Sequence, residues 1–196
     1  GSEMCIRDSL HLDHARDYDE IRKAIDAGYS SVMFDGSSLP LKENILGTKR
    51  VVDYARARNV SVEAELGTVG GTEDGIAVSQ DDACYTDPED AVEFVKQTGI
   101  DALAVAIGTS HGQYKSKTNI SFERLKELQE VVDIPLVIHG GTGVKDEDVK
   151  RVIDLGIRKF NVGTELLVGW NRKSRECYDE HRENISNRDN VVPCLD

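Results

Sequence analysis

The stretch "IPLVIHGGTGVKDEDVKRVIDLGIRKFNVGTEL" (residues 134–166) decides the fold. It contains two apolar runs, "PLVIHG" (135–140) and "KFNVG" (159–163), of the kind that ends in glycine and is typical of buried parallel strands. Between them lies a helical pattern with Asp146 as its expected N-cap. A strand, a helix and a strand in this order predict parallel strands joined by a helical crossover.

The same pattern is repeated along the chain. Further strands are expected at 10–13, 30–36, 61–67 and 102–108. Helices are expected to begin at a capping box of Asp17 with Glu20, at Pro40, at Asp87 followed by Pro88, at Ser121, and around Thr164, the last one running to about His181. The sequence therefore predicts six consecutive strand-helix units.

These units predict an α/β fold with a parallel sheet. No G-x-G-x-x-G follows the first strand, which disfavours a dinucleotide-binding domain. A (β/α)8 TIM barrel fits better but needs eight units and about 250 residues. We therefore expect an incomplete barrel over residues 10–196, lacking its first two units and cut short at its C-terminal end. Residues 1–9, "GSEMCIRDS", have no strand or helix periodicity and are expected to be a foreign or artefactual leader.

The composition limits the classes of partner. The 196 residues carry a net charge of −12, which argues against nucleic-acid and anionic-membrane partners. No run of about 18 apolar residues predicts a membrane span. The four cysteines are scattered without a C-x-x-C spacing, which favours a reducing, cytoplasmic setting.

Ionisable residues gather at the predicted carboxyl ends of the strands, where barrels of this kind carry their chemistry. Three of the five histidines, His14, His111 and His139, occupy equivalent strand ends. Three histidines around an open cavity are the ligand set of a catalytic Zn²⁺ with one free position. The alternative is that each is an ordinary hydrogen-bonded histidine. The role of His11 stays open, and His181 is expected at the surface.

Glycine-rich loops follow the last two predicted strands, in "HGGTGV" (139–144) and "NVGTEL" (161–166). Backbone N–H groups before a helix start favour a phosphate, and the last two loops of such a barrel are a frequent phosphate site. The alternative is ordinary turn glycines. A long loop at 67–87 is expected to be either a mobile lid carrying Glu73 or Asp74 as a base, or a solvated loop.

Two glutamates, Glu63 and Glu65, share one face of the strand at 61–67, which we expect to be the barrel interior. A buried carboxylate needs a partner or a metal. For Glu63, a structural ion pair is the alternative.

Seven ordered blocks, "HLDHARD", "AIDAGYSSVMFDGSSLP", "VEAELGTVGGTEDG", "YTDPEDAVEFV", "DALAVAIGTSHGQYK", "IPLVIHGGTGV" and "GIRKFNVGTEL", closely resemble the class II, zinc-dependent ketose-bisphosphate aldolases. The resemblance implies a cytoplasmic barrel enzyme of carbohydrate metabolism and glycolysis, usually a homodimer or homotetramer. Such enzymes reversibly cleave fructose or tagatose 1,6-bisphosphate to dihydroxyacetone phosphate and glyceraldehyde 3-phosphate. The implied cofactors are one catalytic Zn²⁺ and, as an optional addition, a monovalent cation.

The resemblance also implies roles for individual residues. Asp13 matches the acid/base of the C4 hydroxyl, and Glu73 matches the lid glutamate that handles the dihydroxyacetone phosphate proton. The implied zinc ligands are His14, His111 and His139. The implied substrate contacts are Gly112, Gly140, Gly141, Thr142, Asn161, Val162, Gly163 and Thr164. Asp35 and Glu65 match acids close to the metal and are candidates for a second metal position.

No Schiff-base lysine is expected, because Lys159 is predicted to begin its strand at the opposite end of the barrel. The missing units predict a poorly stable, inactive chain that keeps its three ligands, since an open sheet exposes edges and faces. Two other functions remain open: a zinc hydrolase on the same fold, and a non-catalytic fragment that binds metal or sugar phosphate.

Overall fold

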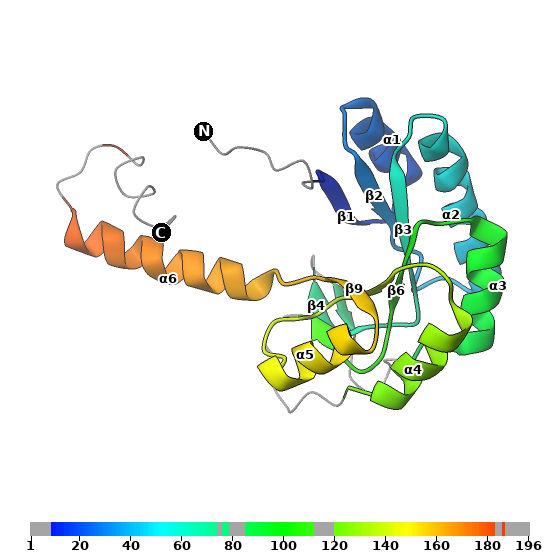
Figure 1. The fold of residues 1–196 in the computed structure, drawn as a ribbon. Coiled ribbons are helices and arrows are strands. Elements are labelled where there is room, and N and C mark those ends of the chain that lie inside the picture. The colour runs from blue at the N-terminus through cyan, green and yellow to red at the C-terminus, as the bar shows by residue number, and fades with distance from the viewer. Residues whose placement is uncertain (1–8, 74–75, 79–84, 112–119, 183–185, 187–196) are drawn as a thin grey trace.

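Six parallel strands form the main sheet, in the order β1-β2-β3-β6-β8-β9 (Figure 1). The computed structural model describes residues 9–73, 76–78, 85–111, 120–182 and 186, and it describes only the backbone at 70–73, 76–78 and 111. The expected leader at 1–9 therefore lies almost entirely outside the described residues. The strands of this sheet are β1 (His11–Ala15), β2 (Ser31–Phe34), β3 (Ser61–Leu66), β6 (Ala102–Val105), β8 (Leu136–Ile138) and β9 (Ile157–Phe160).

A helix follows each of these six strands, so the predicted alternation is confirmed. The helices are α1 (Tyr18–Asp26), α2 (Leu41–Arg56), α3 (Pro88–Thr98), α4 (Phe122–Val131), α5 (Asp146–Asp154) and α6 (Thr164–Glu180). Helices α1 to α4 pack successively on one another along the outer side of the sheet (Figure 1). This arrangement is that of an incomplete (β/α)8 barrel, open between its two outer strands, β1 and β9.

Side-chain caps fix the starts of three helices as predicted. Asp17 accepts a hydrogen bond from the backbone N–H of Glu20, and Asp87 and Ser121 cap α3 and α4 in the same way. The prediction that Asp146 caps α5 was wrong. The N-cap is Lys145, and Asp146 is the first helical residue, where its charge stabilises the positive end of the helix dipole.

The segment at 67–87, expected to be one long loop, contains two short strands. Strand β4 (Gly70–Glu73) pairs antiparallel with β5 (Ile76–Val78) and parallel with β7 (Ser110–His111), which makes a second, three-stranded sheet. The prediction of a long loop is therefore wrong for these residues. Residues 74–75 and 79–84 of the expected lid, Asp74 included, lie outside the described residues.

The two faces of the main sheet differ in chemistry. Side chains such as Val32, Ala64 and Leu103 point toward the helices and join the large apolar core. Alternate residues point to the inner face, where Met33, Ala104 and Val137 form only a small apolar cluster. The rest of the inner face is therefore available to the polar residues of the candidate site.

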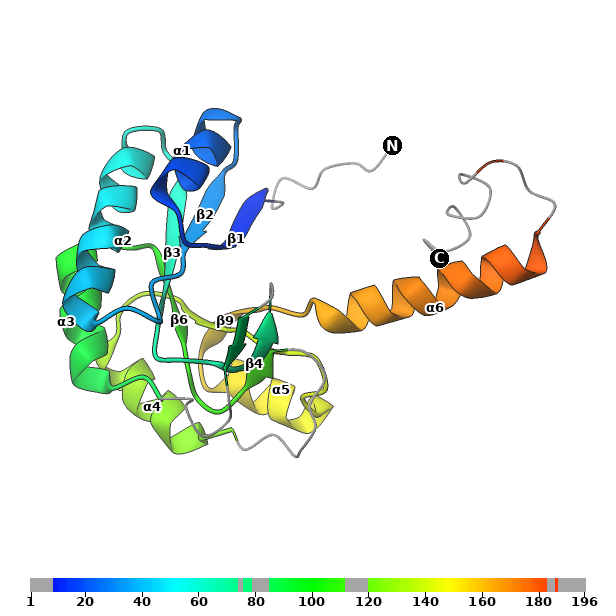
Figure 2. The ribbon, with the colours of Figure 1, turned by 180° about the vertical axis from the view of Figure 1, so that it is seen from behind.

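Helix α6 projects away from the rest of the structure in both views (Figures 1 and 2). Only Cys177 is buried among its described residues. Its exposed apolar side chains include Leu166, Leu167, Val168 and Trp170. Among the described residues, no helix combines the length and the apolar character that crossing a bilayer requires.

Candidate functional site

The inner face of the sheet brings the predicted site residues together. Because side chains alternate along a strand, positions two apart share a face, and parallel strands place their carboxyl ends at one edge. The residues placed there are Asp13 of β1, Asp35 after β2, Glu63 and Glu65 of β3, His139 after β8, and Asn161 after β9.

A local irregularity lets two consecutive residues of β1 face the site. Simple alternation would send Asp13 inward and His14 outward. His14 instead has a φ of 48°, and the register between β1 and β2 shifts between Leu12 and Ala15. A bulge of this kind redirects a side chain, and a positive φ at a non-glycine residue is strained. The strain is located at a predicted metal ligand.

His14 and His139 meet at the centre of the site. His14 Nε2 lies 2.6 Å from His139 Nδ1, and the two rings are perpendicular with centroids 4.5 Å apart. The carboxylate of Asp13 completes a group whose ligand atoms all lie within 4.8 Å of one another. Two of the three predicted zinc ligands therefore converge, although they are 125 residues apart in the chain.

The second ring nitrogen of each histidine faces a buried carboxylate. His139 Nε2 donates to Glu63 Oε1 over 2.8 Å. His14 Nδ1 lies 3.3 Å from Asp35 Oδ2, which also accepts hydrogen bonds from Arg16. In metal sites, such a carboxylate fixes the tautomer and ring orientation of the ligand histidine.

Glu65, the other predicted metal-proximal acid, lies on the far side of His14. Its Oε2 is 3.8 Å from His14 Nδ1. The ligand atoms of His14, Asp35 and Glu65 form a second group within 4.8 Å. The structure therefore places both predicted metal-proximal acids beside a predicted ligand.

Asp13 lies at the mouth of the site, next to the histidine pair. The amide of Asn161 donates to both of its carboxylate oxygens, each over 3.3 Å. Partial burial opposes ionisation of Asp13, but its hydrogen bond with His11 and the neighbouring side chains of His139, His14 and Lys159 outweigh this effect and hold its pKa well below the usual range. Asp13 is therefore a carboxylate at neutral pH, as a proton acceptor must be.

The charge states of the inner residues suit a cation. Burial lowers the pKa of His139, even though its hydrogen bond to Glu63 acts in the opposite direction. A neutral imidazole is the form that binds a metal ion. Glu63 is buried, which favours its neutral form, yet His139 and Lys159 lower its pKa and keep it ionised. Imidazole nitrogens next to carboxylates form a donor set that fits Zn²⁺.

Three predicted site residues are described only in part or not at all. The backbone of His111 belongs to β7, paired with Gly71 of β4, and Glu73 is the last residue of β4. The structure describes only the backbone of His111 and Glu73. Gly112 lies outside the described residues altogether. The third zinc ligand and the lid base therefore remain predictions.

The two predicted phosphate loops lie side by side. The N–H of Gly141 donates to the carbonyl of Asn161 over 3.0 Å, and the N–H of Glu165 donates to Thr142 Oγ1 over 3.2 Å. Helix α6 begins directly after them, with Gly163 as its N-cap and no side-chain cap at that position. An added Cβ at Gly163 would meet nothing within 4 Å. The arrangement places a helix N-terminus directly after the two loops, and such an N-terminus favours an anion.

Gly140→Ala is expected to destabilise the protein by about 2–4 kcal/mol. Gly140 has a φ of +69°, and an added Cβ would press on the backbone of Ser110, which cannot move without shifting β7. Urea unfolding followed by circular dichroism measures this loss. The matched control is Gly163→Ala, which we expect to stay within about 0.5 kcal/mol of the wild type. Equal stability of the two variants would contradict the close packing of the loop on β7.

Lys159 is a site residue that the sequence analysis misplaced. Strand β9 begins at Ile157, so Lys159 is its third residue and not its first. Its ammonium group donates to Glu63 Oε2 over 2.7 Å and lies 3.4 Å from His11 Nε2. The signal that could have found it is alternation, because Lys159 precedes Asn161 by two positions and shares its face.

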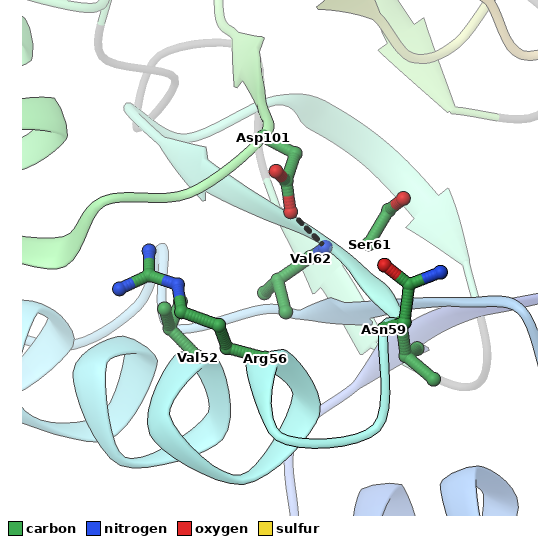
Figure 3. Close-up of a pocket in the computed structure, with 7 residues that line it drawn as sticks. Val52, Arg56, Asn59, Ser61, Val62 and Asp101 are labelled. Carbon is green, nitrogen blue, oxygen red and sulfur yellow. Dashed lines mark hydrogen bonds between the residues drawn. The ribbon is translucent and has the colours of Figure 1, made fainter.

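A small pocket at the opposite end of the strands carries none of this chemistry (Figure 3). It has a volume of about 140 Å³ and is lined by Val52, Arg56, Asn59, Val60, Ser61, Val62 and Asp101. Asp101 accepts a hydrogen bond from the backbone N–H of Val62 over 2.8 Å and so ties β3 to the start of β6. Residues at this end of a barrel serve stability.

The fold and this site define a barrel with a candidate metal centre at the carboxyl ends of its strands. The model of the class II fructose-bisphosphate aldolase family matches residues 3–193. The chain belongs to this family.

Known relatives agree with this assignment. The chain is 46% identical over 184 residues to 6-phospho-5-dehydro-2-deoxy-D-gluconate aldolase of Bacillus licheniformis, covering 94% of this chain and 62% of that protein. The crystal structure of the YdjI aldolase from Escherichia coli K12 is similar with a TM-score of 0.75 and 36% identity, over 94% of this chain and 66% of that one. Fructose-bisphosphate aldolase from Campylobacter jejuni gives a TM-score of 0.70 and 26% identity, over 94% and 63%. The chain thus spans somewhat less than two thirds of the length of these relatives.

Proposed function

We propose that this chain carries the zinc site of a class II aldolase and that its reaction is the reversible aldol cleavage of a phosphorylated ketose. The observation that carries the proposal is the pair formed by His14 and His139. Each points one nitrogen toward the other and its second nitrogen toward a buried carboxylate. His111, whose backbone lies in β7, is proposed as the third ligand.

The reaction breaks a carbon–carbon bond next to a ketone, which leaves negative charge on the carbonyl oxygen. When bound, Zn²⁺ would supply the Lewis acid that polarises this carbonyl and stabilises that charge. Asp13 accepts the proton of the C4 hydroxyl as the bond breaks and returns it in the reverse reaction. Asn161 holds the Asp13 carboxylate in place through its amide.

The remaining roles concern the phosphate and the second proton. We assign the phosphate of the dihydroxyacetone phosphate half to the loops at 140–142 and 161–164, whose backbone N–H groups and helix N-terminus favour an anion. We assign proton transfer on the same half to Glu73, at the end of β4. Asp35 and Glu65 are proposed to orient His14 and to offer a second metal position.

Two substrate classes are proposed. Fructose or tagatose 1,6-bisphosphate follows from the family to which the chain belongs. A phosphorylated deoxy-gluconate follows from the curated relative at 46% identity. Both require a phosphate site and a metal-polarised ketone, and they differ at the end of the sugar that leaves as the aldehyde. A role in glycolysis, a monovalent cation, a cytoplasmic location and a homodimer or homotetramer remain predictions.

Zinc is expected to bind this chain in a 1:1 ratio and to stabilise it. With free zinc at a thousand times its Kd, the free energy of unfolding should rise by about 4 kcal/mol, because the ion binds only the folded state. Thermal unfolding with zinc and with EDTA measures this shift, and elemental analysis measures the stoichiometry. A folded chain that neither binds zinc nor gains stability would contradict the metal site.

Aldol cleavage is tested in the same samples with fructose 1,6-bisphosphate, tagatose 1,6-bisphosphate and the phosphorylated deoxy-gluconate. The dihydroxyacetone phosphate that is released is reduced by an added NADH-dependent enzyme, and the loss of NADH measures the rate of cleavage. EDTA-sensitive cleavage of one of them would support the aldolase proposal and identify the substrate. The expectation that the chain by itself is inactive remains a prediction, and bound zinc without cleavage would agree with it. Zinc-dependent hydrolysis without aldol cleavage would favour a hydrolase instead.

A further inference from the structure

Lys159 is the one lysine that the described structure places against the candidate metal site. Its ammonium group lies 2.7 Å from Glu63 Oε2, and its side chain is partly buried. The partner carboxylate is almost completely buried, at 3% exposure for the residue. An ionised carboxylate in such a position requires compensation by hydrogen bonds and opposite charge.

Glu63 divides its two oxygens between two partners. Oε2 accepts from Lys159, and Oε1 accepts from Nε2 of His139 over 2.8 Å. His139 is itself only 1% exposed. A lysine on β9, a glutamate on β3 and a histidine after β8 are thereby connected across the inner face of the sheet.

This connection determines which nitrogen of His139 carries the proton. An acceptor at Nε2 favours the tautomer with its hydrogen there, which leaves Nδ1 unprotonated. Nδ1 is the atom that lies 2.6 Å from His14 Nε2. The ring is therefore set with its unprotonated Nδ1 toward the position proposed for the zinc ion.

The other histidine shows a comparable arrangement. Arg16 donates two hydrogen bonds to Asp35 Oδ2, at 3.0 and 2.8 Å, and this oxygen lies 3.3 Å from His14 Nδ1. In both cases a cationic side chain anchors a buried carboxylate, and the carboxylate faces a histidine. The repetition argues that Lys159 does more than neutralise one buried charge.

We propose that Lys159 is a positioning residue of the metal site: it anchors Glu63, and Glu63 holds His139 with Nδ1 directed at the metal. The inference rests on the proposed zinc site and assigns Lys159 no contact with substrate. Its effect on His139 passes through Glu63, which makes the two residues non-additive.

The test measures the zinc Kd of Lys159→Met, Glu63→Gln and the double variant by competition with a chromophoric chelator. We expect a Kd increase of about tenfold for Lys159→Met and about 10- to 100-fold for Glu63→Gln. The double variant should bind zinc no more weakly than Glu63→Gln alone. Lys159→Arg, which keeps the charge, should restore binding to within about threefold of the wild type. Lys96→Met, on the exposed face of α3, is the matched control and should have no effect.

A second measurement requires no zinc. Long-range ¹H–¹⁵N spectra of the zinc-free wild-type chain report the tautomer of His139. The signals of its ring are assigned as those that disappear in His139→Gln. The proposal requires the proton on Nε2, and an Nδ1-protonated ring would overturn it. A folded Lys159→Met chain with an unchanged zinc Kd would overturn it as well. A wild-type chain that binds no zinc would contradict the proposed function, while the tautomer in the wild type and in Lys159→Met would still decide whether Glu63, anchored by Lys159, orients His139.

Discussion

His139→Ala is expected to abolish zinc binding at micromolar protein and metal concentrations. His139 offers Nδ1 to the site from an almost fully buried position, so that no neighbouring side chain or water replaces it without rearrangement. Zinc sites with four ligands bind with about 10–16 kcal/mol, so one ligand accounts for roughly 3 kcal/mol, or more than about a hundredfold in Kd. Elemental analysis after dialysis and a chelator competition measure the loss.

The loss of the imidazole ligand must be distinguished from the packing defect that His139→Ala also creates. His139→Gln fills most of the space and keeps an amide that can reach Glu63, but it lacks the imidazole nitrogen, and zinc binding should be lost in it too. His181→Ala is the matched histidine control, since His181 is the exposed C-cap of α6. Retention of the wild-type Kd in a folded His139→Ala chain would remove the central support for the zinc site.

Asp13→Asn is expected to slow aldol cleavage by about 10²- to 10⁴-fold, the usual contribution of a positioned acid or base. The substitution keeps the shape of the side chain and its hydrogen-bonding position next to Asn161. It removes the carboxylate, whose lowered pKa makes it an ionised proton acceptor at neutral pH. An amide cannot accept the proton of the C4 hydroxyl.

The same variant also tests whether Asp13 acts as a ligand, because its carboxylate lies close to both histidine nitrogens. If Asp13 is a proton acceptor and not a ligand, Asp13→Asn should change the zinc Kd by less than about tenfold while the cleavage rate falls. A parallel loss of zinc would instead assign Asp13 to the metal. Asp19→Asn, in the exposed first turn of α1, is the control. Single-turnover assays with protein in excess detect slow cleavage, which matters for a chain that its missing units predict to be inactive.

Much of the fold could be predicted from local sequence patterns. Strands β2, β6 and β8 are short and mostly apolar runs. Asp17, Asp87 and Ser121 accept the cap hydrogen bonds that their positions indicate. These features depend on residues close in sequence. The pairing of β4 with β5 and β7 was not predicted, because "GGTE" and "IAV" are short, the first contains two glycines, and the sheet depends on a third strand some 40 residues away.

The candidate site was predictable where strand ends identify it, as for Asp13 and His139. It was not predictable where a charge sits inside a strand. Lys159 and Arg158 make "IRKF" read as polar, so the strand was placed two residues too late and Lys159 was assigned to the wrong end of the barrel. The ion pair with Glu63 that keeps Lys159 inside joins residues 96 positions apart, and no local pattern encodes it.

The projection of α6 has a consequence for spectroscopy. Trp170 is the single tryptophan of the chain, and it lies on this helix with 39% of its surface exposed. Its emission therefore reports the solvent around α6 and not the packing of the sheet. A shift of the emission maximum to shorter wavelength would mark the moment when another surface covers this helix.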